Sequence, residues 1–223
     1  MSNLIERVIF VAVIHTDLES VENVRKVVHE IKPEVVAVEL DRERYQQLTN
    51  PVESKEHLSP QTTGDSAQDL MQQLAILEMS LSKVTGSNVG DEMLAAIQEG
   101  RAVGAKIALV DRPMQATIQA MMHVPLNELY ALINVLPDAA KDIDGGGAID
   151  ILDMLKKEGA VEDIMNQFQT EFPELAKVLI AERDEYVAKA LHFILKDIKG
   201  KIVAVLGAGH IQGVKSSLER ILA

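Results

Sequence analysis

An alternation between short apolar runs and helical patterns is the strongest constraint on how this chain can fold. Four runs are typical of buried strands, because each is short, rich in β-branched residues and bounded by turn residues. Apolar residues at helical spacing fill the stretches between them. Strands connected through helices pair in parallel, and the first strand–helix–strand unit favours a right-handed crossover. The strands are expected at 6–14, 35–38, 106–110 and 201–206.

This alternation predicts an α/β fold: a small, mostly parallel sheet of about four strands covered by helices. A long helical insert at 113–198 should precede the last strand, and the 223 residues suit a single domain, 1–223. A polar stretch at 49–66 is too long for an ordinary connection, which indicates a lid, a mobile loop or a disordered segment. Helices are expected at 18–32, 67–82, 90–102, 172–196 and 211–222.

The composition excludes several classes of function. The chain has 34 acidic and 22 basic residues, a net charge of −12 that would repel nucleic-acid backbones and anionic lipid. Aromatic residues make up only 3%, which argues against binding by base stacking. The absence of cysteine rules out disulfides, thiolate metal sites and a cysteine nucleophile. We therefore expect no nucleic-acid partner.

The location of the protein can be narrowed in the same way. Residues 1–7 lack the pattern of a signal peptide, and no apolar run approaches the roughly 18 residues that span a bilayer. We expect no membrane segment in this chain, and a place in the cytoplasm or in the cytoplasmic domain of a longer membrane-associated protein. The aliphatic, methionine-containing insert could bury a dimer face, so a homo-oligomer stays an open alternative.

Polar residues follow all four expected strands, and two of them are histidines in similar settings. His15 follows the first strand and His210 the last, while Glu39 and Asp111-Arg112 follow the other two. The carboxyl ends of parallel strands lie at one edge of a sheet, where open α/β folds bind their ligands. Imidazole and carboxylate groups are good ligands for Zn, Mn, Fe or Co. The sequence therefore predicts a divalent metal ion at this edge, with positions left open for a bound water.

Each of these residues also has a structural explanation. A histidine after a strand is commonly a hydrogen-bonded turn residue, and Glu39 or Asp111 could simply cap the next helix. The charged run 182–185 is typical of a solvated helix face unless that helix crosses the same sheet edge. Gly207-x-Gly209-x-x-x-Gly213 is close to a dinucleotide phosphate loop, but only ten residues follow it, too few for the expected next strand.

Six stretches of the chain also carry a family resemblance, and together they span most of its length in a fixed order. The chain resembles the TraB/PrgY family, which is related to Tiki-type proteins and more distantly to erythromycin-esterase and ChaN-like folds. In that family the two histidines belong to paired Gly-x-x-His motifs. The matching stretches are 14–20, 36–41, 91–93, 108–112, 181–184 and 205–210.

The resemblance implies both an activity and a set of site residues. The Tiki branch implies metal-dependent peptidase activity, and the PrgY branch implies the shutdown of a peptide pheromone. This chain departs from the pattern at Ala12, where the first motif usually has glycine. Alanine loses freedom at positive φ, so activity would depend on why glycine is used there. The family motif maps onto His15, Glu39, Glu92, Asp111, Arg112, Glu182, Arg183 and His210.

The leading hypothesis is a metal-dependent hydrolase of peptide or amide bonds that acts on a peptide substrate. His15, Glu39 and His210 would bind the ion, with Glu92 or Glu182 as a further ligand or general base. Arg112 and Arg183 would stabilise the developing oxyanion as fixed cations.

Two alternatives remain open from the sequence. One is a non-catalytic module that binds a peptide or partner, motivated by Ala12 and the acidic excess. The other, weaker alternative is a cofactor-binding protein that uses Gly207–Gly213.

Overall fold

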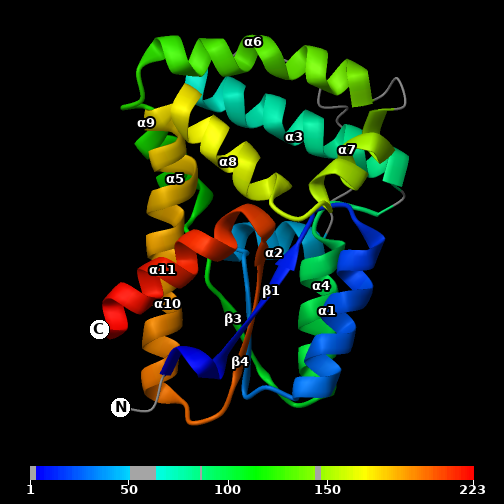
Figure 1. The fold of residues 1–223 in the computed structure, drawn as a ribbon, viewed down its shortest axis with the longest axis vertical. Helices are drawn as coiled ribbons and strands as arrows, with labels where there is room; N and C mark the ends of the chain where they lie inside the picture. Colours follow the sequence, from blue (N-terminus) through cyan, green and yellow to red (C-terminus); the bar gives the residue numbers. More distant parts are fainter. Residues whose placement is uncertain (1–3, 51–63, 86, 144–146) are drawn as a thin grey trace.

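A four-stranded parallel sheet forms the centre of the molecule. The structure is a computed structural model that describes residues 4–50, 64–85, 87–143 and 147–223 (Figure 1). The strand order is β1-β4-β2-β3, so the first and last strands of the chain are neighbours. All three strand pairs are parallel, which confirms the predicted α/β class. The strands are β1 (Val8–Val13), β2 (Val35–Val38), β3 (Lys106–Leu109) and β4 (Ile202–Gly207).

The register brings the carboxyl ends of the strands to one edge of the sheet. Val13 at the end of β1 pairs with Gly207 at the end of β4. Val38 at the end of β2 pairs with Val205 of β4 and with Leu109 at the end of β3. The residues that follow the four strands therefore emerge close together.

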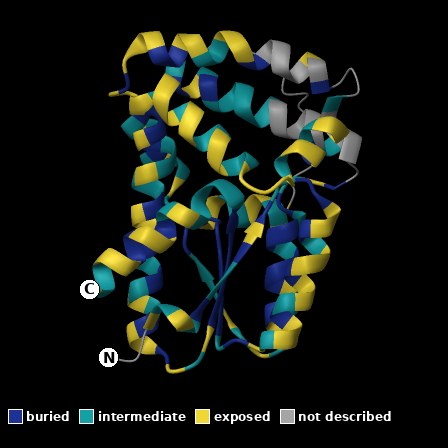
Figure 2. Ribbon diagram, in the orientation of Figure 1, coloured by how far each residue is buried: buried dark blue, intermediate teal, exposed yellow. Residues whose placement is uncertain are grey.

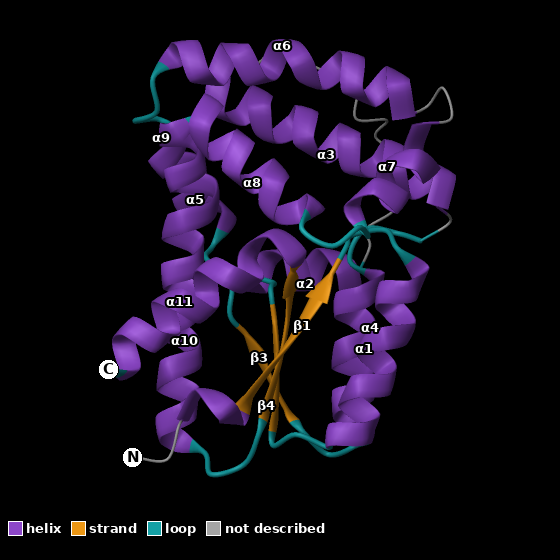
Figure 3. Cartoon of the chain, viewed as in Figure 1, coloured by secondary structure: helices purple, strands orange, loops and turns teal. Residues whose placement is uncertain are grey.

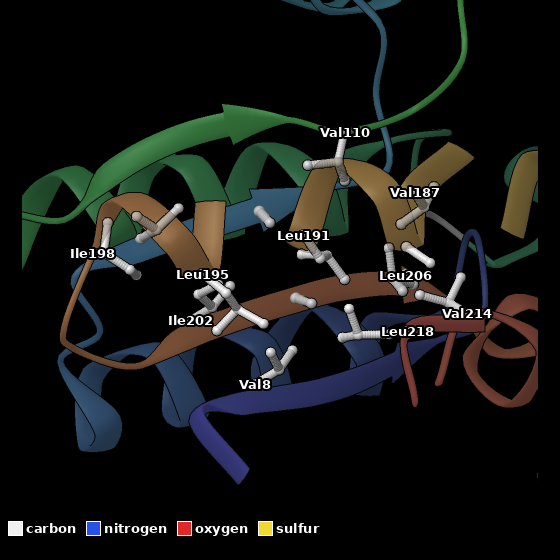
Figure 4. Packing of buried hydrophobic residues seen from close by; sticks show 14 residues of the cluster. Val8, Val110, Val187, Leu191, Leu195, Ile198, Ile202, Leu206, Val214 and Leu218 are labelled. Carbon is white, nitrogen blue, oxygen red and sulfur yellow. The ribbon is translucent and has the colours of Figure 1, made fainter. Parts of the chain in front are cut away.

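Helices cover both faces of the sheet (Figure 1). On one face, α1 (Leu18–Ile31) and α4 (Asp91–Ala102) pack against the strands through an aliphatic cluster that includes Val24 and Met93. On the other face lie α10 (Glu182–Asp197) and α11 (Ile211–Leu222). Figure 4 shows Leu191 of α10 and Leu218 of α11 directed toward β4. Both faces of β4 are consequently buried, whereas the edge strands β1 and β3 carry intermediate and exposed residues (Figure 2).

A third layer of helices lies beyond the carboxyl ends of the strands (Figure 3). Its core includes the fully buried Leu70, Met121 and Leu175. The layer supports the prediction of a helical insert before the last strand. A shorter helix, α2 (Arg42–Thr49), follows β2. The helices of the layer are α3 (Ser66–Thr85), α5 (Met114–Met121), α6 (Leu126–Asp142), α7 (Ala148–Leu155), α8 (Ala160–Glu171) and α9 (Pro173–Ala176).

The structure differs from the sequence prediction at the helix expected over 172–196. After α9 the chain forms a π-helical turn, η3 (Lys177–Ala181), before α10 begins. Arginine side chains donate to the carbonyl oxygens of Val178 and Leu179, which supply hydrogen bonds from outside the helix at this turn. Side-chain insertion of this kind, and π turns themselves, are common causes of irregular helices. The other short turns are η1 (Leu4–Arg7) and η4 (Ala208–His210).

Most of the predicted 49–66 loop lies outside the described residues, so its role as a lid stays a prediction. Thr49 ends α2 and Ser66 begins α3. The first helix, α1, ends at Ile31, one residue before the expected end at 32, because Lys32 adopts a left-handed conformation with φ 46°. Within the described part of the chain, no helix is long and apolar enough to cross a membrane.

Candidate functional site

The first histidine of the site pairs with a buried carboxylate. His15 lies in the turn after β1, and its Nδ1 donates to Glu92 Oε1 at 2.7 Å. Glu92 is in the first turn of α4, where a carboxylate is stabilised by the helix dipole, and it is only 1% exposed. Its second oxygen, Oε2, has no hydrogen-bond partner in the described structure. The turn is held by Asp17, which caps α1 by accepting from the Ser20 N–H at 3.0 Å.

The second histidine forms a matching pair on the other side of the sheet. His210 Nδ1 donates to Asp184 Oδ1 at 2.6 Å, and Asp184 belongs to the first turn of α10. A Cβ at Gly213 would overlap Asp184 Oδ2, so only glycine lets α11 pack against this carboxylate. This packing gives Gly213 a structural role, while cofactor binding at Gly207–Gly213 stays a prediction.

The two pairs and Glu39 meet around Gly207, the last residue of β4. A Cβ placed on Gly207 would lie 3.4 Å from His15 Nε2, 3.5 Å from Glu39 Oε2 and 3.6 Å from His210 Cδ2. His210 Nε2 lies 3.5 Å from Glu39 Oε1. The absence of a side chain at Gly207 therefore leaves a small space that three of the predicted site residues border.

Glu39 is fixed by a buried arginine. The carboxylate follows β2 and is 5% exposed; its Oε2 accepts from the Gly207 N–H at 2.7 Å. Its Oε1 accepts from Arg183 Nη2 at 2.7 Å. Arg183 also donates to both oxygens of Asp111, from Nε at 3.2 Å and from Nη2 at 2.8 Å. Arg183 thus connects α10 to the ends of β2 and β3.

The charges of the cluster shift the pKa values of its members. Burial opposes the ionisation of Glu39, but the positive charges of His210, Arg183 and His15 and the Gly207 N–H lower its pKa to about 2. Burial would lower the pKa of His210, yet Glu39 and Asp184 raise it. Burial also raises the pKa of Asp184, against the effect of His210. Glu39 is therefore a carboxylate at neutral pH, while the His210–Asp184 pair retains a proton readily.

Two of the predicted residues form a separate pair. Arg112 donates from Nη1 to Glu182 Oε2 at 2.9 Å, from Nε to Thr117 Oγ1 at 3.1 Å and from Nη2 to the Val178 carbonyl at 2.8 Å. These contacts tie the start of α5 to the π turn. Arg112 and Glu182 thus bind each other and the helical layer, and their contacts do not include His15, Glu39 or His210.

Asp184 is the site residue that the sequence analysis missed, because the charged run around it is typical of a solvated face. The signal was present in the helical spacing. Asp184 precedes the buried Val187, Ala188 and Leu191 by three, four and seven residues, so it shares their face. Arg183 and Asp184 reach the site, whereas Glu185 pairs with Lys189 along the outer face of α10.

The backbone at Ala12 does not require glycine. Ala12 is an exposed residue of β1 that pairs with Leu206, one position before Gly207. Among the described residues other than glycine, only Thr16 and Lys32 have positive φ, so Ala12 needs none of glycine's freedom. The two histidine motifs are therefore offset by one residue across the sheet.

The donor chemistry of the site fits a divalent ion, although the side chains do not form a ready-made cage. Within the described residues, no three His, Cys, Asp or Glu side chains lie close enough together to hold a metal ion as they stand. Metal-binding histidines commonly donate their second ring N–H to a carboxylate, as His15 and His210 do here. With Glu39 they offer two imidazoles and a carboxylate, and Glu39 Oε1 is shared with Arg183.

The fold and the site define the class of protein: an α/β protein with a parallel sheet and two histidine–carboxylate pairs at the carboxyl edge of that sheet. The comparison with known families agrees with the resemblance in the sequence: the model of the TraB/PrgY/gumN family matches residues 5–222, and the chain belongs to this family. An uncharacterised protein of Methanocaldococcus jannaschii is 30% identical over 93% of this chain and 52% of its own length. The TraB domain-containing proteins of Bos taurus and Homo sapiens are 25% and 24% identical over 95% of this chain. The chain spans about half to three-fifths of these relatives, since 62% of each mammalian protein is covered.

Proposed function

We propose that this chain is a metal-dependent hydrolase of peptide or amide bonds, in which His15, Glu39 and His210 bind a divalent ion such as Mn, Zn, Co or Fe. The observation that carries the proposal is the pair of histidine–carboxylate hydrogen bonds, 2.7 Å and 2.6 Å long, on the two histidines that border Gly207. Inactivation of a signalling peptide is the role that the PrgY branch of the family would add.

The residues of the site would divide the work as follows. Glu92 and Asp184 accept from Nδ1 of their histidines, so Nε2 is the ring nitrogen through which each histidine would bind an ion. In the structure Arg183 Nη1 lies 3.4 Å from His210 Nε2, so this arginine would have to give way to an ion there. Glu39 stays ionised because its pKa is about 2. The bound ion would lower the pKa of a water molecule and polarise the substrate carbonyl.

Arg183 is the cation best placed to stabilise charge that develops on the substrate. It lies within hydrogen-bonding distance of Glu39 and is held rigidly by both oxygens of Asp111. Fixed cations of this kind stabilise an oxyanion without reorganising during the reaction. Arg112 and Glu182 would contribute by holding the π turn from which α10 begins, because their hydrogen bonds go there.

The alternative proposal is a module that binds a peptide without cleaving it. One observation favours it: Arg183 pairs with both Glu39 and Asp111, and Arg44 lies 3.5 Å from Asp111, so two cations already balance these two carboxylates without an ion. Such a module would show saturable peptide binding and no cleaved product.

Peptide cleavage after metal exchange tests the two proposals against each other. The protein is treated with a chelator, reloaded separately with Mn, Zn, Co or Fe(II), and incubated with a mixed peptide library read by mass spectrometry. The hydrolase predicts products that depend on one of these ions and disappear in His15→Gln and His210→Gln. His123→Gln is the matched control, because His123 is exposed and bonds only its own helix turn. Binding without any product under all four ions would favour the alternative.

A further inference from the structure

A cavity of about 330 Å³ lies beside the His210–Asp184 pair, and the proposed function does not use it. Its walls come from α8, from the π turn, and from the segment where β4 passes into α11. Asp184 lines the cavity and also accepts the hydrogen bond from His210 Nδ1. The cavity and the candidate site thus share one carboxylate.

The lining of the cavity disfavours anionic ligands and offers apolar surface to an aliphatic group. Apolar surface comes from Val161, Met165 and Ile180. Among the described residues that line it none is basic, while Glu162 and Asp184 are acidic, so a ligand carboxylate would find no counter-charge. Amide groups suited to hydrogen-bonding a peptide backbone are supplied by Asn166, Gln169 and Gln212.

The wall of the cavity next to the candidate site is formed by Gly209 and the flexible side chain of Met165. A Cβ on Gly209 would lie 3.0 Å from Met165 Sδ, so glycine allows the thioether to approach the turn that carries His210. Methionine is flexible and fills irregular gaps, which suits a pocket for aliphatic groups. The volume lies at the small end of the range for ligand sites, large enough for one side chain with its adjoining peptide groups.

We infer that this cavity binds an aliphatic side chain of the peptide ligand next to the candidate hydrolytic site, with Met165 as the residue that sets the preference. The inference rests on the proposed function for the identity of the ligand as a peptide. The binding itself does not require cleavage, so the two can be tested separately.

The test uses protein labelled at the methionine methyl groups, with the Met165 signal assigned by its loss in Met165→Leu. The probes are three blocked pentapeptides, acetyl-Gly-Gly-Xaa-Gly-Gly-amide, with leucine, glutamate or lysine in the centre. We expect the leucine peptide to shift the Met165 signal at the lowest concentration, and the signal of Met122 to stay unmoved, because Met122 is 66% exposed on α5's end. An unmoved Met165 signal, or a lysine or glutamate peptide that binds as tightly as leucine, overturns the inference.

A charge swap supplies an independent check. Met165→Lys should reduce the preference for leucine over glutamate by about tenfold or more, since it adds the missing counter-charge. Met122→Lys is the matched control and should leave the preference unchanged. Leucine-selective shifts at Met165 without cleavage would overturn the hydrolase but support the pocket. Cleavage by wild-type protein without such shifts would support the hydrolase and overturn the pocket.

Discussion

Gly207 is the residue at which the needs of folding and of the site can be separated. Its φ of −53° and ψ of 138° are open to any residue, so alanine introduces no backbone strain. The added methyl would meet His15, Glu39 and His210 at 3.4–3.6 Å, which is ordinary contact, but it would occupy the space that they border.

Gly207→Ala should therefore fold normally and lose its site. We expect a change in melting temperature of less than about 4 °C, equivalent to roughly 1 kcal/mol, and a fall of about 10- to 100-fold in affinity for the divalent ion. Calorimetry and metal titration measure the two effects. Unchanged metal affinity would show that the space at Gly207 is not where the ion binds.

Glu39 should give the protein a stability that disappears in acid. Its pKa in the folded state, about 2, is below the ordinary value of 4.5, so folding favours the ionised form. The resulting stability is fully present above pH 4.5 and is lost as the pH falls toward 2; its size is about 3 kcal/mol. Urea unfolding between pH 6 and pH 3 should show a weaker pH dependence in Glu39→Gln. The exposed Glu43→Gln is the control, and equal slopes in all three proteins would contradict this account.

At the scale of elements, two cross-links of unlike strength hold the helical layer to the rest of the fold. Arg112 is 10% exposed in its side chain and joins the start of α5 to the π turn and Glu182. Lys156, after α7, pairs with Asp17 and Glu19 of the first helix, but its side chain is 32% exposed.

Arg112→Ala should destabilise the protein by about 2 kcal/mol, because it leaves partly buried hydrogen-bond acceptors without their donor. Lys156→Ala should cost less than about 1 kcal/mol, since exposed ion pairs contribute little. Equilibrium unfolding in urea compares the two. A larger loss for Lys156→Ala would mean that the outer link, rather than the π turn, anchors the layer.

Local patterns predicted the elements well and their irregularities poorly. The strands and the helices over 18–31 and 211–222 follow directly from apolar spacing. The π turn does not, because it accepts hydrogen bonds from Arg112 and Arg183. Arg112 is distant in the sequence, and the inward orientation of Arg183 is set only in the folded chain. The spacing of Asp184 to Val187 and Leu191 could have predicted that it lies on the buried face of its helix. Its hydrogen bond to His210 could not be predicted, because it forms only in the tertiary fold.

At the scale of the whole molecule, the strand order decides how the site is built. Sequence predicts that the carboxyl ends of parallel strands share one edge, but it does not predict that β4 lies between β1 and β2. That order places Gly207 between His15 and Glu39, and the one-residue offset of the register pairs Ala12 with Leu206 in place of Gly207. Pairing across nearly the full length of the chain depends on contacts that no local pattern encodes.

The central claim is that His15, Glu39 and His210 together bind one divalent ion, and metal content tests it most directly. The test compares four proteins: the wild type, His15→Ala, His210→Ala and the control His123→Ala. Each is equilibrated with Mn, Zn, Co or Fe(II) and freed of excess metal, and its bound metal is measured by elemental mass spectrometry. We predict one ion per chain in the wild type and the control, and almost none in either site variant. Equal metal content in all four proteins would contradict the claim.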